Sequence, residues 1–156
     1  MFISLLVVSM LFAADAPTIS EAVTDEHGFR VHRVTSEFQR GETLIRVLLP
    51  DQMESGRALK VLYVLPVEAG TERRYGDGLI EAKRLDLANR HQLICVAPTF
   101  SHLPWYADHP TDKAIQQESY FVKLVVPAVE KRYPALVNET VACLSVSANP
   151  VTARGV

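Results

Sequence analysis

The sequence predicts an α/β fold, and three observations carry that prediction. Three apolar runs, 59–65, 93–97 and 140–146, are typical of strands that are buried on both faces of a sheet. Segments with helical periodicity separate these runs. Two loosely alternating segments, 28–39 and 43–49, come first and are typical of an antiparallel hairpin. The predicted order is therefore a hairpin followed by β-α-β-α-β, which right-handed crossovers would assemble into a mixed, mostly parallel sheet.

Two helices are predicted between the three apolar strands. The first begins after Asp77, whose carboxylate suits a helix N-cap, and its apolar residues recur at helical spacing: Leu79, Ala82, Leu85 and Ala88. The second is expected to begin after Asp112. Pro127 lies inside that second helix. Because a proline there removes a hydrogen bond and clashes with the preceding turn, at a cost of about 3 kcal/mol, we expect a kink or break near Val125.

Length, composition and charge exclude several classes of protein. The 156 residues suffice for one domain with a sizeable core, and 48% hydrophobic with 22% charged residues is ordinary for a globular chain. The net charge is −2 and no stripe of Lys and Arg appears, so no nucleic-acid partner is expected. No apolar run is long enough to span a bilayer.

The N-terminal stretch resembles a signal peptide. Residues 1–14 are mostly apolar, and Ala14-Asp15-Ala16 fits an A-x-A cleavage site, although no Lys or Arg occurs before Arg30. The alternatives are a buried first strand or a misassigned start codon. We expect residues 1–16 to be removed, 17–156 to form the domain, and the protein to be secreted or periplasmic.

Three motifs carry a resemblance to a known family. The run 61–65 leads into Pro66-Val67-Glu68-Ala69-Gly70, the run 93–97 leads into Pro98-Thr99-Phe100, and the second helix contains E-S-Y-F at 118–121 and V-V-P-A-V-E-K-R-Y at 125–133. Over residues 28–146 the chain resembles the N-terminal half of the esterase branch of the α/β-hydrolase superfamily, which includes esterase D-like and feruloyl-esterase-like enzymes. The resemblance implies a partial α/β-hydrolase fold in which Pro127 has a regular place.

The resemblance also implies part of an oxyanion hole. In this family the turn that corresponds to 66–70 supplies a backbone donor, so the N–H of Glu68 is the expected contact to a developing oxyanion. The match is incomplete, because Pro66 stands where the family often has His, whereas Gly70 matches the last glycine of the turn.

The loop 101–110 is the expected substrate rim, because it would follow a strand at the carboxyl edge of the sheet, where ligands bind in open α/β sheets. Trp105, Tyr106 and His109 are its candidate binding residues, although the two rings could equally seal the sheet edge. A metal site is the less favoured alternative, since the spacing of its candidate ligands matches no known pattern: His102, Asp108, His109 and Asp112. No metal and no other cofactor is expected.

The two cysteines, Cys95 and Cys143, both lie in apolar strand-like runs, and we favour small buried side chains over a disulfide. In the usual strand order of the resembled superfamily, the strand 59–65 lies between them. Neither cysteine belongs to a C-x-x-C or a metal-like spacing.

The catalytic elbow of the family is missing after the third apolar run. There the family has G-x-S-x-G, whereas this chain continues A-C-L-S-V-S-A-N-P-V-T-A-R-G-V, with no glycine beside Ser145 or Ser147. The segment can also be translated in a shifted frame, in which each new codon joins the last base of one residue's codon to the first two bases of the next. In that frame it can spell L-L-V-G-F-S-K-S-G-Y-G-A-W-G. We therefore expect a frameshift near Val141, so that the segment from about 142 departs from the family frame.

Two functions remain open from the sequence. The first is a fragment of a secreted serine carboxylic-ester hydrolase, acting in its intact form on a small-molecule or carbohydrate-linked ester and inactive here because the elbow, acid and His are absent. Ser145 or Cys143 as a replacement nucleophile is disfavoured, because no base is identified for either. The second is a secreted non-catalytic binding module that uses the loop 101–110.

Overall fold

A computed structural model describes residues 16–67, 76–103 and 106–145, with side chains described up to residue 137. One seven-stranded sheet runs in the order β1-β3-β4-β6-β5-β7, with β2 also paired to β3. The strands are β1 (Thr18–Ile19), β2 (Val23–Thr24), β3 (Arg30–Thr35), β4 (Glu42–Leu48), β5 (Leu59–Leu65), β6 (Leu93–Pro98) and β7 (Ala135–Ser145). The helices are α1 (Gly78–Arg84), α2 (Leu87–His91), α3 (Gln117–Tyr120), the π-helix η1 (Phe121–Val125) and α4 (Val126–Arg132).

The sheet is mixed, as expected. Its described strand pairings are mostly antiparallel, however, which corrects the expectation of a mostly parallel sheet. Among the described strands, β5 pairs in parallel with β6 and with β7, whereas β3 pairs antiparallel with β1, β2 and β4, and β4 pairs antiparallel with β6. The short strands β1 and β2, which the sequence did not indicate, add two of these antiparallel pairings. The prediction of a mostly parallel sheet rested on the three apolar runs, which form only the parallel part of the sheet.

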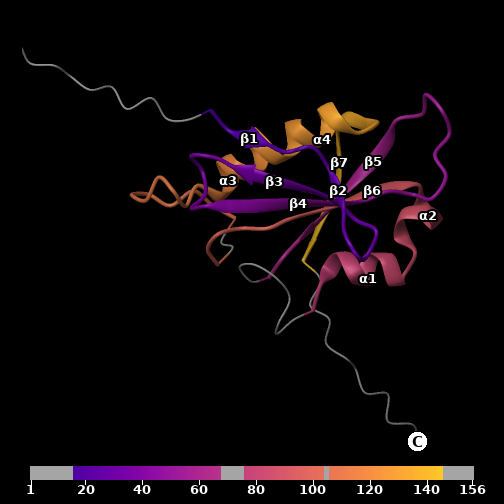
Figure 1. Cartoon of the computed structure of the whole chain (residues 1–156), viewed down its shortest axis with the longest axis horizontal. Helices are drawn as coiled ribbons and strands as arrows, with labels where there is room; N and C mark the ends of the chain where they lie inside the picture. Colours follow the sequence, from indigo (N-terminus) through magenta and orange to yellow (C-terminus); the bar gives the residue numbers. More distant parts are fainter. Residues whose placement is uncertain (1–15, 68–75, 104–105, 146–156) are drawn as a thin grey trace, which may run out of the picture.

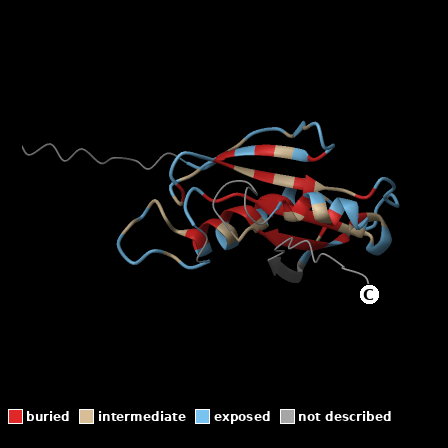
Figure 2. Cartoon of the chain, turned by 90° about the horizontal axis from the view of Figure 1, so that it is seen from below, coloured by how far each residue is buried: buried red, intermediate tan, exposed pale blue. Residues whose placement is uncertain are grey.

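The helices cover opposite faces of the sheet (Figure 1). Alternate residues of β5 separate two cores: Val61 and Tyr63 pack with the α3–η1–α4 segment, whereas Leu62 and Val64 pack with α1 and α2. Because successive side chains of a strand point to opposite faces, an uninterrupted apolar run is what a strand with two covered faces requires. Figure 2 shows these central strands buried between exposed outer surfaces of the helices.

The first predicted helix is broken into two. Asp77 caps α1 as expected, since its side chain accepts hydrogen bonds from the amides of Leu79 and Ile80. The helix ends at Arg84, Leu85 is its C-cap, and Asp86 adopts a left-handed backbone (φ 54°) before α2 begins. Leu85 is therefore 45% exposed instead of lying on the buried face. Apolar periodicity could not reveal this break, because the periodicity continues across it.

The second predicted helix begins four residues later than expected. Asp112 instead stabilises a turn, where its carboxylate accepts the amide of Ala114 at 3.0 Å, and α3 begins at Gln117. The discontinuity expected near Val125 takes the form of the π-helix η1, which ends there. Pro127 follows in the first turn of α4, where a missing N–H costs least.

The remaining sequence predictions concern β7, the cysteines and the termini. Strand β7 begins at Ala135, before the expected run 140–146. Strand β5 lies between β6, which carries Cys95, and β7, which carries Cys143.

Among the described residues, no helix combines the length and the hydropathy that crossing a membrane requires. The expected signal peptide lies almost wholly outside the described residues.

Candidate active site

The topology places a change of direction in the connections at the carboxyl ends of β5 and β6. These two strands are parallel neighbours, with Tyr63 opposite Val96. The segment after β5 leads to α1 on one face of the sheet, whereas the segment after β6 leads to α3 on the other. Neighbouring strands whose connections diverge in this way form a topological switch point, where open α/β sheets bind ligands. The candidate site therefore lies between the chain that follows Leu65 and the chain that follows Pro98.

Tyr106 links the segment that follows β6 to the segment that follows β5. Its phenol donates a hydrogen bond to the carbonyl of Pro66, directly after β5, and its amide donates to Oε1 of Gln117 at 3.1 Å. The ring stands edge-on to Phe100 at 5.7 Å between centroids. Its backbone is left-handed (φ 55°), a conformation that is unusual for an aromatic residue. Tyr106, a predicted binding residue, is thus an internal tie that keeps 37% of its surface exposed.

Two buried glutamines, which no motif in the sequence indicates, hold the loop that follows β6. Gln117, only 1% exposed, donates to the carbonyls of Leu103 at 2.9 Å and His102 at 3.4 Å. Gln39, 3% exposed, accepts both the amide and the hydroxyl of Ser101, at 3.1 and 3.0 Å. Burying an amide side chain is costly unless it is hydrogen-bonded, so these bonds fix the loop firmly onto the hairpin and α3.

His109 shapes a turn in the loop that precedes α3. Its Nδ1 accepts the amide of Asp112 at 2.9 Å and that of Thr111 at 3.3 Å. The hydroxyl of Thr111 also lies 3.4 Å from Nδ1, but that nitrogen already accepts backbone protons and is not available as a base for the hydroxyl. Arg40 pairs with the Asp112 carboxylate at 2.5 Å. These contacts are internal to the protein, and the predicted role of His109 in binding substrate stays a prediction.

Asp108 is an acid fixed at the start of α3. It accepts the Ser119 amide at 2.9 Å and the Ser119 hydroxyl at 2.6 Å. Burial acts to raise the pKa of Asp108, but the two hydrogen bonds from Ser119 and the positive charge of Lys123 outweigh it, so the pKa is lowered. Asp108 is therefore an ionised structural carboxylate at neutral pH rather than a proton donor.

Several predicted site residues lie outside the described structure. Glu68 and Trp105 are among the residues that are not described, and the side chains of Cys143 and Ser145 are likewise outside it. Within the described residues, no group of three or more His, Cys, Asp or Glu side chains is arranged to hold a metal ion. The described part of the site thus consists of the switch point, the Tyr106 bridge and the glutamine-held loop.

Comparison with known proteins relates this architecture to esterases by fold alone. No protein-family model and no curated protein sequence matches the chain. Among solved structures, an S-formylglutathione hydrolase from Agrobacterium tumefaciens is similar with a TM-score of 0.54 and 16% identity, over 76% of this chain and 49% of that chain. A Bacteroides fragilis protein assigned as an acetyl xylan esterase matches 76% of this chain and 33% of its own, at 16% identity, but its TM-score of 0.32 carries no argument. This chain spans about half the length of the hydrolase, whose fold its own resembles.

Proposed function

We propose that this chain is the N-terminal half of an esterase-like α/β-hydrolase, with its active site in the crevice between the segments that follow β5 and β6. The observation that carries the proposal is the switch point, because the segments on its two sides diverge to opposite faces and Tyr106 ties them together at Pro66. The similarity to an S-formylglutathione hydrolase fold supports it. In its intact form the enzyme would cleave a small-molecule or carbohydrate-linked ester.

The position of β7 supports the shifted reading frame, because it bears on where that frame would place its serine. Ser145 ends β7 opposite Leu65, the last residue of β5, so β7 ends beside the proposed crevice. In the shifted string G-F-S-K-S-G, the first serine falls at the position that Ala148 occupies in the present frame, three residues beyond Ser145. A nucleophile elbow belongs at such a place, since it presents its serine on a tight turn at the end of a strand.

The proposed chemistry divides roles among segments that meet at this edge. The elbow serine would attack the ester carbonyl, and the amide of Glu68 with the amide after the serine would stabilise the oxyanion. Tyr106 would hold the start of the Glu68 segment through Pro66. The histidine and acid of a triad would come from sequence that this frame does not encode. In the present frame we therefore propose no esterase activity, and we propose export of the protein on the pattern of residues 1–16.

Two measurements test this proposal. The present chain should not hydrolyse p-nitrophenyl acetate above background, and its Ser145→Ala variant should give the same rate. Turnover that is lost in Ser145→Ala would show that this frame has its own nucleophile. In parallel, the codons from Val141 onward should read G-F-S-K-S-G when shifted; codons that place no serine between the two glycines would remove the frameshift from the proposal.

A further inference from the structure

A hollow of about 330 Å³ lies near the amino end of β5, whereas the proposed active site lies at its carboxyl end. It is bounded by the end of α4 at Arg132, the start of β3 at Arg30, and the chain after β4 at Leu49. Leu59, the first residue of β5, is hydrogen-bonded to Pro134 next to this hollow, whereas the crevice follows Leu65 at the other end of β5. The two places are therefore separated by the length of a strand.

Two arginines, both exposed, line this hollow. Arg30 shares a strand face with His32 and Val34, the face that α4 covers, and Arg132 belongs to the last turn of α4. Burial raises the pKa of Tyr133, which lines the same hollow, while the positive charges of Arg30 and Arg132 both act to lower it. In the part of the chain that the structure describes, neither arginine makes an ion pair within 4.0 Å.

The hollow also has a built floor and an apolar wall. His32, 4% exposed, is fixed by hydrogen bonds to the carbonyl of Ser20 at 2.8 Å and to the phenol of Tyr133 at 2.7 Å. Because the carbonyl can only accept, Nδ1 of the neutral ring carries the proton and Nε2 accepts from the phenol. Leu49 and Met53 line the other side, and Met53 leaves 42% of its surface exposed.

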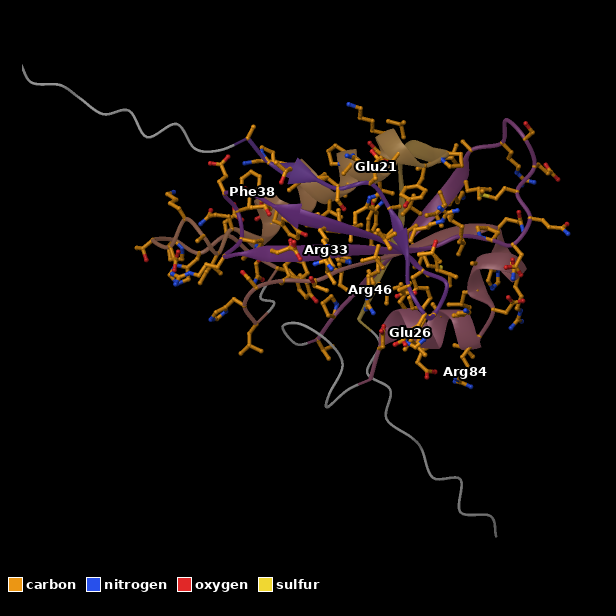
Figure 3. All side chains as sticks on the ribbon, viewed as in Figure 1. Glu21, Glu26, Arg33, Phe38, Arg46 and Arg84 are labelled. Atoms are coloured by element: carbon orange, nitrogen blue, oxygen red, sulfur yellow. The ribbon has the colours of Figure 1, made fainter. Side chains whose placement is uncertain are left out.

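One acidic residue faces the same space. Glu21 lines the hollow, and Figure 3 shows it on the side of the sheet that α4 covers, away from Arg46 and Glu26 on the side of α1. Its carboxylate, like the carbonyl end of α4, opposes an anion in the hollow. Two full positive charges nevertheless exceed one carboxylate, and the helix end contributes only about half a charge. The local balance therefore favours an anion, and favours it more when Glu21 is neutralised.

We propose that this hollow binds a small carboxylate with a short apolar chain, held between Arg30 and Arg132 with its chain against Leu49 and Met53. A planar carboxylate matches the guanidinium fork in two hydrogen bonds, and like charges that face one cavity are relieved by an anion between them. The volume is at the small end of the range for ligand sites, which fits a ligand of this size. The site is separate from the proposed esterase crevice and does not depend on it.

The test is a titration of the full 156-residue chain with hexanoate, hexanol and inorganic phosphate, followed by calorimetry or by NMR shifts. Saturable one-to-one binding of hexanoate is expected, at least about tenfold tighter than that of hexanol, since only the acid can engage both arginines. Phosphate, which lacks an apolar chain, should bind more weakly than hexanoate. Raising the salt concentration should weaken hexanoate binding.

Matched variants separate this site from general charge. Arg30→Gln and Arg132→Gln should each weaken hexanoate binding about tenfold, and Glu21→Gln should tighten it. Arg33→Gln is the control, because Arg33 lies on the opposite face of β3 and pairs with Glu42 at 2.6 Å. Far-UV circular dichroism checks the fold, and Arg30→Lys with Arg132→Lys replace any Gln variant that unfolds; with the planar fork lost, both should still weaken binding.

Four results would contradict the proposal. The first is the absence of saturable hexanoate binding, and the second is equal binding of hexanol and hexanoate. The third is an Arg33→Gln variant that loses as much affinity as Arg30→Gln, because binding would then follow overall charge. Phosphate that binds more tightly than hexanoate would contradict the apolar wall.

Discussion

The two faces of the sheet are held by different means. Among the described residues, the face under η1 and α4 has a core cluster of sixteen buried residues, with Tyr120 among the largest side chains. The described cluster under α1 and α2 has eight, and this face adds an ion pair in which Arg46 contacts Asp77 at 2.5 and 3.0 Å. The stabilisation from apolar burial increases with area, so we expect the ion pair to contribute a larger share of the stability on the smaller face. Substitutions on the two faces should therefore differ in the type of interaction that they remove and in the size of the stability loss.

The largest loss of stability is expected from Asp77→Ala. The change leaves Arg46, whose side chain is 13% exposed, without its carboxylate, and it also removes the N-cap of α1. Removing one partner of a buried pair costs about 3–5 kcal/mol in free energy of unfolding. Urea denaturation measures it. Glu81→Ala, which breaks an exposed pair with Arg84 on the same helix, should cost at most about 1 kcal/mol; similar losses in both variants would contradict the role given to the buried pair.

The same carboxylate gives the α1 face an acid dependence. Burial acts to raise the pKa of Asp77, but the hydrogen bond and charge of Arg46 with two amide bonds outweigh it, so the folded pKa lies below 3.8. The unfolded state then binds the proton at higher pH than the folded state. Stability should therefore fall as the pH drops below about 4, and Asp77→Asn should lack this part of the dependence.

Cysteine reactivity gives the next largest effect and tests the strand order. Burial raises the pKa of Cys95 to about 11, from 9.0, which lowers its thiolate fraction about a hundredfold at neutral pH. Cys95 should be unreactive to iodoacetamide until the chain is denatured. Strands two places apart are separated by about 9.6 Å, beyond the roughly 7 Å that a disulfide allows. Denatured chain without reductant should therefore show two thiols; none would mean that β5 does not lie between β6 and β7.

The smallest effect is expected on the larger face, from Tyr120→Phe. The phenol is hydrogen-bonded to Thr43 at 2.8 Å in a buried environment, and losing this bond costs about 1 kcal/mol. Burial raises the pKa of Tyr120 to about 12, from 10.0, so the folded state keeps its proton longer than the unfolded state. Stability should fall as the pH rises from 10 to 12, and less steeply in Tyr120→Phe. If Tyr120→Phe loses stability with rising alkaline pH as steeply as the parent chain does, the phenol is not buried as described.

The sequence predicted strands better than helices, for a physical reason. The run 59–65 coincides with β5, because a strand covered on both faces must be apolar throughout. The break at Asp86 and the late start of α3 at Gln117 depend on backbone conformation and on tertiary hydrogen bonds, which apolar spacing does not register. Pro127 was informative because a missing N–H constrains any helix, and the π-helix before it is the consequence.

The candidate site was only partly predictable. The place of the loop 101–110 followed from strand order. Tyr106 bonds to Pro66 within the protein, and its predicted role in binding substrate stays a prediction. Gln39 and Gln117 were missed, because a buried amide has no characteristic spacing in sequence. Their function depends on which carbonyls and amides the fold brings within reach.

The most direct test of the esterase assignment is covalent labelling by a fluorophosphonate, which reacts with activated serines. Two forms should be compared at equal concentration: the present chain, and a chain in which the shifted frame is restored from Val141 through its downstream sequence. Labelling of the restored form alone, and its loss when the elbow serine becomes alanine, is the predicted result. A restored chain that folds but takes no label would contradict the proposed chemistry, and a labelled present chain would contradict its inactivity.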